Sequence, residues 1–468
     1  MHWIENTRAG GGTVSINTFE AHRMTRRTIL HAGMAAVSAA WPASAFQQAA
    51  RRTGAFRDGD PNDPPFKTPA EPVNSPMGDG KGIHPGRVAW AYQPKATAWD
   101  GKTGNWWDDA NTDGNLVAEM VAGSLRSLTG DRTGPEAWRS LFASFKQAQK
   151  LGGGGYRPGE KIAIKLNNNQ DRPGAWRFGS GMPSPHVVYS LVHQLITVAG
   201  VRGQDIVLYD ASRYIGDPIY DRIRANPDPE FQAIRFEVSQ RMAGNGRAEA
   251  VADKGNAVLF SGKDIPTCYL PQCATGATYM INVALSRAHT LMGASHTAKN
   301  WFGSVYFDGL GFSPQLLHDF ASRDRAMGTY TPLVDLVAHK HLGGKTLLHM
   351  VDFLYVAESQ NAKVIRYKSF DDRWCSSLFA SQDPVAIDSV ALDFIRNEPT
   401  ADECRGYPEN YLHEAALAGK APSGTVYNPT REREPAASLG VHEHWNNPRD
   451  KQYSRNLGKN KGIELIKA

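Results

Sequence analysis

Apolar blocks separated by polar turns predict strands that alternate with helices through the middle of the chain. KIAIKLN at 161–167 is an almost continuously apolar strand that ends on three asparagines. SPHVVYSLVHQLITVAG then repeats apolar residues at helical spacing and stops at Gly200, and DIVLYDAS at 205–212 is the next strand. A strand, a helix and a strand with short links predict a right-handed parallel unit, whose ligand crevice lies at the carboxyl ends of the strands.

The same alternation continues on both sides of this unit. Further strands are expected at 87–92, 278–287 and 346–357, further helices at 116–130, 135–150 and 331–345, and a strand, turn and helix within 376–397. This order predicts an α/β fold: a three-layer, open, mostly parallel sheet with helices on both faces and long irregular N- and C-terminal extensions. Residues 46–85, rich in Pro, Gly and Asp, are expected to form an extended lead-in, 86–400 the α/β domain, and 401–468 a C-terminal wrap.

The N-terminal segment resembles an export signal. Residues 24–45 contain a pair of arginines, an apolar run too short to span a bilayer, and a small-residue cleavage site. The Thr-Arg-Arg-x-Ile-Leu core resembles the twin-arginine signal, which a receptor reads. The resemblance implies that 1–45 is a signal peptide, that the twin-arginine translocase is a partner, and that the cleaved protein is periplasmic or secreted without membrane insertion. Met24 is an alternative start.

Composition and charge exclude several classes of protein. The 468 residues are 41% hydrophobic and 21% charged, which excludes a disordered, collagenous or coiled-coil chain. A net charge of +5 without a Lys/Arg block gives no basic footprint for nucleic acid. Common nucleotide-binding, serine-hydrolase and zinc-protease motifs are absent. Cys268, Cys273, Cys375 and Cys404 contain no C-x-x-C, so no iron–sulphur cluster is expected; disulfides and free core thiols both remain open.

Residues 281–303, INVALSRAHTLMGASHTAKNWFG, concentrate polar side chains directly after a predicted strand. Lys299 would supply a compact cation for phosphate, sulfate or carboxylate, and a histidine could move protons near neutral pH. Solvation of a loop is the structural alternative. The candidate catalytic residues are His289, His296, Lys299 and Asp383, and the candidate ligand-binding residues are Asn167, Asn168, Arg287, Asn300, Asp210 and Asp388.

Two of these carboxylates also have structural interpretations. Asp383 stands before a proline, where it would cap a helix as readily as serve a site. Asp388 lies within an otherwise apolar helix and needs a partner, for which Lys299 or Arg287 is the candidate.

The cofactor is left open, with a divalent metal as one option. Asp210, Asp352 and Asp383 with Asn167 could hold Mg²⁺ or Ca²⁺, although no spacing signature supports this set. The His442-Glu443-His444 segment would place both imidazoles on one side of an extended strand, which suits a transition metal. Two ligands are insufficient, and an exposed loop is the simpler interpretation.

Three tryptophans lie in the long loop at 93–115. Trp99, Trp106 and Trp107 could stack on sugar rings or cover a core, and core packing is favoured.

Four stretches resemble the family called domain of unknown function 362. They are IKLN at 164–167 with the helix that follows it, residues 281–303, HMVDFLYVAE at 349–358, and ASQDPVAIDSVALDF at 380–394. The resemblance implies an open α/β fold. Some members carry a ferredoxin module, which this chain lacks. The family pattern usually has a lysine before the histidine of the second motif, where this chain has Arg287 near His289. The resemblance implies no settled activity.

The clustering of cation, base and amide predicts an enzyme of hydrolase, lyase or isomerase type. Its substrate would be a small anionic or carbohydrate-derived molecule bound in the crevice at the carboxyl ends of the strands. A non-catalytic periplasmic ligand-binding protein is the alternative, and a redox protein loaded with cofactor before export is a weaker one.

Overall fold

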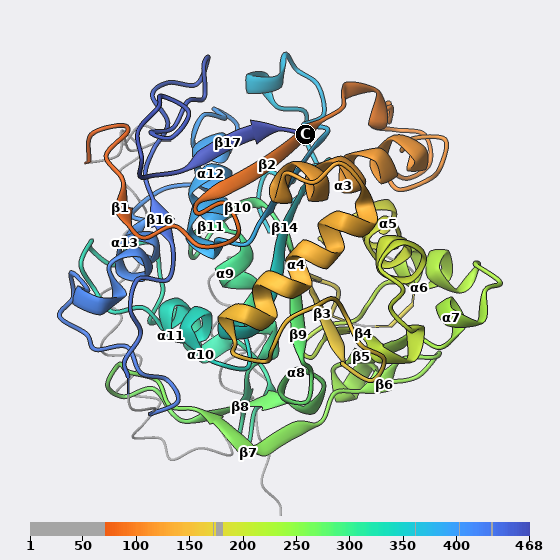
Figure 1. Ribbon diagram of the computed structural model, residues 1–468, viewed down its shortest axis with the longest axis horizontal. Coiled ribbons are helices and arrows are strands. Elements are labelled where there is room, and N and C mark those ends of the chain that lie inside the picture. Colours follow the sequence, from red (N-terminus) through yellow and green to blue (C-terminus); the bar gives the residue numbers. More distant parts are fainter. Residues whose placement is uncertain (1–70, 172, 175–180, 361, 402, 432–433) are drawn as a thin grey trace, which may run out of the picture. The chain divides into compact units, whose positions relative to one another are not determined.

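Strands that are apolar on both faces are stable only when helices cover both sides of their sheet. In the computed structural model, which describes residues 71–468 except 172, 175–180, 361, 402 and 432–433, nine strands form one such sheet. Its order is β17 (Glu464–Lys467), β2 (Arg87–Tyr92), β15 (Ser377–Ser381), β14 (Thr346–Phe353), β9 (Tyr279–Leu285), β3 (Ile162–Leu166), β4 (Ile206–Asp210), β5 (Arg235–Val238) and β6 (Ala248–Glu249). The described residues belong to a single unit (Figure 1).

All pairs in this sheet are parallel except those made by β15, which runs antiparallel to both β14 and β2. The mixed α/β architecture with a mostly parallel sheet is therefore confirmed. The carboxyl ends of β3, β4, β9 and β14 lie along one edge of the sheet, whereas the carboxyl end of β15 lies along the other.

Helices pack against both faces of the sheet. On one face, Ala89 of β2 and Ile164 of β3 share a core with α3 (Gly114–Thr129), α4 (Gly134–Ala148) and α5 (Pro185–His193). On the other face, Trp90 of β2 packs with α12 (Pro384–Arg396). Ala163 of β3 packs on the same side with α9 (Thr297–Asn300) and α11 (Pro332–Ala338). This arrangement gives the three layers that the sequence predicts.

The predicted helices are found, but two are shorter than expected. α3 begins where Asp113 accepts hydrogen bonds from the N–H groups of Asn115 and Leu116 at 2.9 and 3.1 Å. The helix expected to reach Gly200 ends its α-helical part at His193 and continues as a π-helical turn at Gln194–Val198. The helix expected at 331–345 occupies only Pro332–Ala338.

Several strands were not predicted from the sequence, and most of them are too brief to show alternation. A hairpin of β10 (Arg287–His289) and β11 (Gly293–Ser295) follows β9 directly. A separate four-stranded sheet contains β13 (Gly311–Phe312), β12 (Tyr306–Phe307), β8 (Cys268–Pro271) and β7 (Ala252–Val258). The hairpin is the more important one, because it carries two of the candidate site residues.

The C-terminal segment does more than wrap the domain. α13 (Asn410–Ala416) packs against α12, and β16 (Val441–His442) pairs with β1 (Met77–Gly78). Tyr427 and Tyr453 are fully buried, and β17 is the edge strand of the central sheet. Aromatic residues scattered among turns supply the buried area that a purely surface segment would lack.

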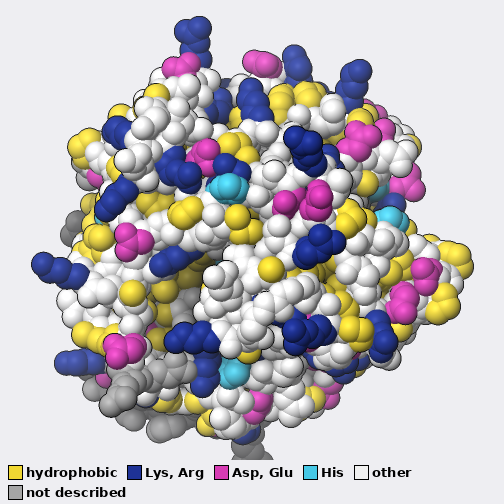
Figure 2. Space-filling model, in the orientation of Figure 1, with side chains coloured by type: hydrophobic (Ala, Val, Ile, Leu, Met, Phe, Trp, Pro, Cys, Tyr) yellow, Lys and Arg dark blue, Asp and Glu magenta, His cyan; other side chains and the backbone are white. Residues whose placement is uncertain are grey.

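Three further findings bear on the sequence predictions. The four cysteines are buried free thiols. In the described part of the chain, no helix has both the length and the apolar character needed to cross a bilayer. Figure 2 shows Lys and Arg interspersed with Asp and Glu over the face in view. The predicted signal peptide at 1–45 and the first part of the lead-in lie outside the described residues.

Candidate functional site

The parallel strands bring several predicted site residues to one edge of the sheet. Asp210 ends β4, and Asn167 and Asn168 directly follow the neighbouring β3. Asp210 is buried and accepts hydrogen bonds from the N–H of Asn168 at 3.0 Å and from the N–H and hydroxyl of Ser212 at 3.2 Å. Asn167 is half-buried, and its Oδ1 accepts from the N–H of Leu285 at 3.3 Å. These contacts join the ends of β3, β4 and β9.

Lys165 of β3 is part of this site, although the sequence analysis did not select it. Its side chain is 1% exposed, and its Nζ lies 3.1 Å from Asp210 Oδ2. The same Nζ donates to Asn300 Oδ1 at 3.0 Å, and Asn300 Nδ2 in turn donates to Asn282 Oδ1 at 2.7 Å. Burial lowers the pKa of Lys165, while Asp210 opposes that shift. Asn300 therefore acts by positioning Lys165 rather than by facing a ligand.

Arg287 of β10 has a buried guanidinium group with hydrogen-bond donors that lack a partner among the described residues. It is 3% exposed, and its Nε and Nη1 have no hydrogen-bond partner among the described residues. Burial, together with the charge of Arg213, lowers its pKa to about 10. The backbone of Gly181 lies against this guanidinium, because a Cβ atom at Gly181 would overlap Nη1. Burying a charge without a partner is costly, so this arrangement favours a bound counter-ion.

Lys299 of α9 adds another cation to the same neighbourhood. It is half-buried, and its pKa is lowered to about 7 by burial, with Arg213, Arg287 and Lys165 adding to the effect and Asp210 opposing it. We call Lys165, Arg213, Arg287, Lys299 and Asp210 the basic cluster. It contains four cations and one carboxylate, so it attracts anions.

The side-chain amide of Asn168 lies beside the basic cluster. Neither its Nδ2 nor its Oδ1 has a hydrogen-bond partner in the part of the chain that the structure describes. The N–H of Asn168 binds Asp210, so the backbone is fixed while the amide stays available. An amide with both a donor and an acceptor free suits a polar ligand.

The two candidate histidines are neutral near pH 7. His289 Nδ1 accepts from the N–H of Leu291 at 3.1 Å, and burial followed by the charge of Lys299 holds its pKa well below the ordinary value. His296 Nδ1 lies 3.0 Å from Ser286 Oγ, and burial lowers its pKa to about 3. His296 and Lys299 also line a small cavity of about 20 Å³. Both imidazoles are thus suited to hydrogen bonding rather than to carrying charge.

Asp383 does not lie with the basic cluster. Because β15 is antiparallel to its neighbours, its carboxyl end is at the opposite edge of the sheet. Asp383 is the N-cap of α12, and its carboxylate accepts from four backbone N–H groups at 2.8–3.2 Å. Burial raises its pKa to about 7. The helix-cap interpretation is correct, and the suggested metal set of Asp210, Asp352, Asp383 and Asn167 does not come together.

Asp388 also differs from the prediction, because its partner is neither Lys299 nor Arg287. Its carboxylate accepts from the N–H and hydroxyl of Thr297 at 2.9 and 2.7 Å and from the N–H of Ala298 at 3.0 Å. The hydroxyl of Tyr411 donates to it at 2.7 Å. Burial raises the pKa of Asp388 to about 6. This carboxylate caps α9 and so fixes the helix that carries Lys299.

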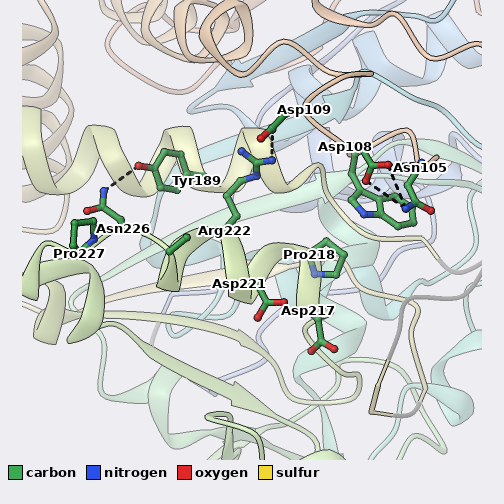
Figure 3. A pocket seen from close by; sticks show the side chains of 12 residues that line it. Asn105, Asp108, Asp109, Tyr189, Asp217, Pro218, Asp221, Arg222, Asn226 and Pro227 are labelled. Carbon is green, nitrogen blue, oxygen red and sulfur yellow. Dashed lines mark hydrogen bonds and ion pairs between the residues drawn. The ribbon is translucent and has the colours of Figure 1, made fainter. Parts of the chain in front are cut away.

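A separate, open groove of about 1160 Å³ lies over α5 and α6 (Asp217–Arg224), as Figure 3 shows. Its polar groups largely pair with one another: Arg222 forms an ion pair with Asp109, and Asn226 Nδ2 donates to the hydroxyl of Tyr189 at 3.0 Å. Trp107 lines the groove.

The other two tryptophans of the 93–115 loop belong to the core. Trp99 stacks on Trp374 with ring centres 5.5 Å apart, and Trp106 packs against Tyr355 with ring centres 5.2 Å apart. The core interpretation therefore holds for Trp99 and Trp106.

His442 and His444 are not in the basic cluster, and they are not in an exposed loop. Both are buried, and both Nε2 atoms face Glu71, with His413 of α13 beside them. Glu71 and His413 could not be predicted from the sequence, because they are far from the His-x-His segment along the chain.

Comparison with known proteins identifies the central part of the chain. Residues 162–393 match the family model described as "Domain of unknown function (DUF362)", and this part of the chain belongs to that family. The match runs from β3 to α12 and includes all members of the basic cluster. No curated protein matches the chain.

Proposed function

We propose that this DUF362 domain is an enzyme of hydrolase, lyase or isomerase type that holds a small anionic substrate in the basic cluster. The observation that carries the proposal is Arg287, whose buried Nε and Nη1 lack a partner among the described residues, within a group of four cations and one carboxylate. An unpaired buried charge costs several kcal/mol, and a bound phosphate, sulfate or carboxylate would remove that cost.

Each member of the cluster has a distinct role in this proposal. The guanidinium of Arg287 would donate charge-assisted hydrogen bonds to the anion from Nε and Nη1. The amide of Asn168 would orient the rest of the ligand. Lys299, with a pKa of about 7, would exchange a proton with the substrate at neutral pH, which is the property required of a general acid or base. The ion pair between Lys165 and Asp210 would fix the positions of the strand ends that form the site.

Sulfate is a suitable first probe, because its charge stays the same between pH 6 and pH 8.5. We expect the affinity of the protein for sulfate, measured by calorimetry, to fall severalfold over this range as Lys299 loses its proton. The Lys299→Met variant should bind weakly and without this pH dependence. Arg287→Gln should weaken binding about 10- to 100-fold, since hydrogen bonds to charged groups are worth about 1.5–3 kcal/mol.

The matched control is Lys461→Met, which removes an exposed lysine outside the cluster and should bind sulfate as the wild type does. Equal sulfate affinity in the wild type and in Arg287→Gln would contradict the proposed site. Turnover is tested separately with a panel of phosphate esters, sugar phosphates and hydroxy acids. Replacing Lys299 and His296 by Ala should abolish turnover and preserve the melting temperature. Tight binding of a panel member without formation of a product would instead support the alternative that the chain is a non-catalytic ligand-binding protein.

We also propose export by the twin-arginine route to the periplasm or the medium. The paired Arg26-Arg27 and the short apolar run that follows support this. Replacing both arginines by lysine should leave the chain in the cytoplasm, as measured by cell fractionation. Unchanged export of that variant would contradict the proposal.

A further inference from the structure

Three imidazoles converge on one carboxylate outside the basic cluster. The Nε2 atoms of His413, His442 and His444 lie 2.8, 3.2 and 3.0 Å from Oε1 of Glu71. The ring of His442 lies 5.0 Å from that of His413 and 4.9 Å from that of His444. His442 and His444 are 0% and 2% exposed, so water does not solvate these two imidazoles, while Glu71 and His413 are half-buried. One oxygen and three nitrogens therefore point at a common position inside the protein.

The hydrogen bonds of His442 fix where its proton lies. Ser389 Oγ is 2.7 Å from the carbonyl oxygen of Val385, to which it must donate its single proton. His442 Nδ1 lies 2.8 Å from the same Oγ, so Nδ1 must be the donor in that bond. A neutral His442 then carries its proton on Nδ1 and presents a lone pair from Nε2 toward Glu71.

His444 is held in the same way by a carboxylate. Its Nδ1 lies 2.5 Å from Asp393 Oδ1, and Asp393 Oδ2 accepts from the N–H of Trp445 at 3.1 Å and the hydroxyl of Tyr453 at 2.9 Å. Nδ1 of His444 therefore donates to the carboxylate of Asp393, and Nε2 is the ring nitrogen that faces Glu71. A carboxylate behind an imidazole is the usual second contact of a metal-binding histidine, because it fixes the tautomer and raises the basicity of the ring.

These contacts direct Nε2 of both rings at one carboxylate oxygen. A metal ion at the point where Nε2 of His442, Nε2 of His444 and Oε1 of Glu71 meet would be bound by all three atoms, since imidazole nitrogens and carboxylate oxygens are its usual ligands. The ligand atoms of Glu71, His442 and His444 all lie within 4.8 Å of one another. Tetrahedral ligands about 2.1 Å from a zinc ion are about 3.4 Å apart, so a small outward movement would admit the ion.

We propose that the chain binds one divalent transition-metal ion of the zinc class through Nε2 of His413, His442 and His444 and a carboxylate oxygen of Glu71. Nitrogen and carboxylate donors in this number are typical of zinc, and four protein ligands make a closed, structural site. The ligands come from the segment before β1, from α13 and from the β16 segment, which lie side by side in Figure 1. The ion would thus tie the beginning of the described chain to its C-terminal part.

The proposal is tested on the full chain with zinc and cobalt as probes. We expect about one equivalent of zinc by mass spectrometry of the purified protein. After removal with a chelator, added Co²⁺ should give the intense visible absorption of tetrahedral coordination. His442→Gln and His444→Gln should each weaken metal binding at least 100-fold, and His413→Gln should weaken it at least tenfold. Asp393→Asn should weaken it about 10- to 100-fold through loss of the second contact.

The matched control is His193→Gln, which replaces an exposed histidine at the end of α5 and should bind metal as the wild type does. If the histidine variants fail to fold, the melting temperature of the wild type tests the proposal. A chelator should lower this temperature, and Zn²⁺ should restore it. The proposal is overturned if the wild type takes up neither Zn²⁺ nor Co²⁺ at tenfold excess, or if His442→Gln and His444→Gln bind as the wild type does.

Discussion

Asp352 lies near the carboxyl end of β14 in the central sheet and shows how burial raises the pKa of a carboxyl group. It is 2% exposed and accepts hydrogen bonds from the N–H groups of Ser184 and Leu354 at 2.5 and 3.0 Å. Burial raises its pKa from 3.8 to about 6, although these two bonds oppose the shift. The folded protein therefore binds this proton more tightly than the unfolded chain does.

This difference makes a prediction for the pH dependence of stability. Because the folded pKa is raised, the stabilising contribution of Asp352 is fully present below about pH 3.8 and is lost as the pH rises through about 6. The loss is at most about 3 kcal/mol, since one pKa unit corresponds to about 1.36 kcal/mol. Asp352→Asn does not titrate. The unfolding free energy of the wild type minus that of Asp352→Asn should therefore fall between pH 4 and pH 7.5, as measured by urea denaturation. A constant difference would contradict this account.

Lys165 shows which kind of site residue is hard to predict from the sequence. The motif after β9 contains Arg287 and Lys299, which lie near Asp210 because polar residues that follow parallel strands meet at one edge. Lys165 was overlooked because it sits within the apolar strand itself. A lysine in a strand that is buried on both faces needs a partner, and that requirement was the available signal.

At the scale of the elements, the direction of a strand within the sheet could not be predicted from the sequence. The apolar pattern located β15 and α12, and it identified Asp383 as a residue between them. A strand that runs antiparallel has the same composition as one that runs parallel, so the pattern could not show that Asp383 lies at the opposite edge. Asp388 was recognised as needing a partner, but that partner is the start of α9, which is too short to be predicted.

The β10–β11 hairpin gives a prediction at the scale of one element. Gly293 closes the hairpin with φ +74°, and a Cβ atom there would lie 2.8 Å from the carbonyl oxygen of Arg405 and 2.9 Å from Cβ of Pro408. Positive φ costs a non-glycine residue about 1–2 kcal/mol, and overpacking adds about 1–3 kcal/mol. Gly293→Ala should therefore lower the unfolding free energy by about 2–5 kcal/mol and weaken sulfate binding, because the hairpin carries Arg287.

Gly311 is the matched control for this variant. Its φ is +73°, but a Cβ atom there would have no neighbour within 4 Å among the atoms of the structure's described residues. Gly311→Ala should lose only the backbone contribution of about 1–2 kcal/mol, and sulfate binding should not change. Equal losses of stability in the two variants would show that contact with Arg405 and Pro408 is unimportant.

At the scale of the whole molecule, both ends of the described chain form part of the folded domain: β1 pairs with β16, and β17 pairs with β2. The sequence analysis ended the domain at residue 400 because the turn-rich remainder shows little periodicity. Burial of Tyr427 and Tyr453 and the pairing of β17 with β2 place that remainder in the domain instead. The apolar pattern identifies strands by length and alternation, whereas the four residues of β17 depend on a partner strand almost 380 positions earlier.

Removal of residues 464–468 tests how far the sheet depends on its last strand. β17 covers the edge of β2, with the N–H of Glu464 donating to Gly86 at 3.0 Å and that of Ala468 to Trp90 at 2.9 Å. Losing several backbone hydrogen bonds of about 0.5–1.5 kcal/mol each should lower the unfolding free energy by about 2–5 kcal/mol. The exposed edge should also promote association, detected by light scattering, since an unpaired strand is a template for another chain. Glu464→Gln removes the ion pairs of this carboxylate with Arg87 (2.8 Å) and Arg455 (3.6 Å) and should cost no more than about 1 kcal/mol. If this single change destabilises the protein as much as the truncation, the ion pairs rather than the strand pairing hold this edge.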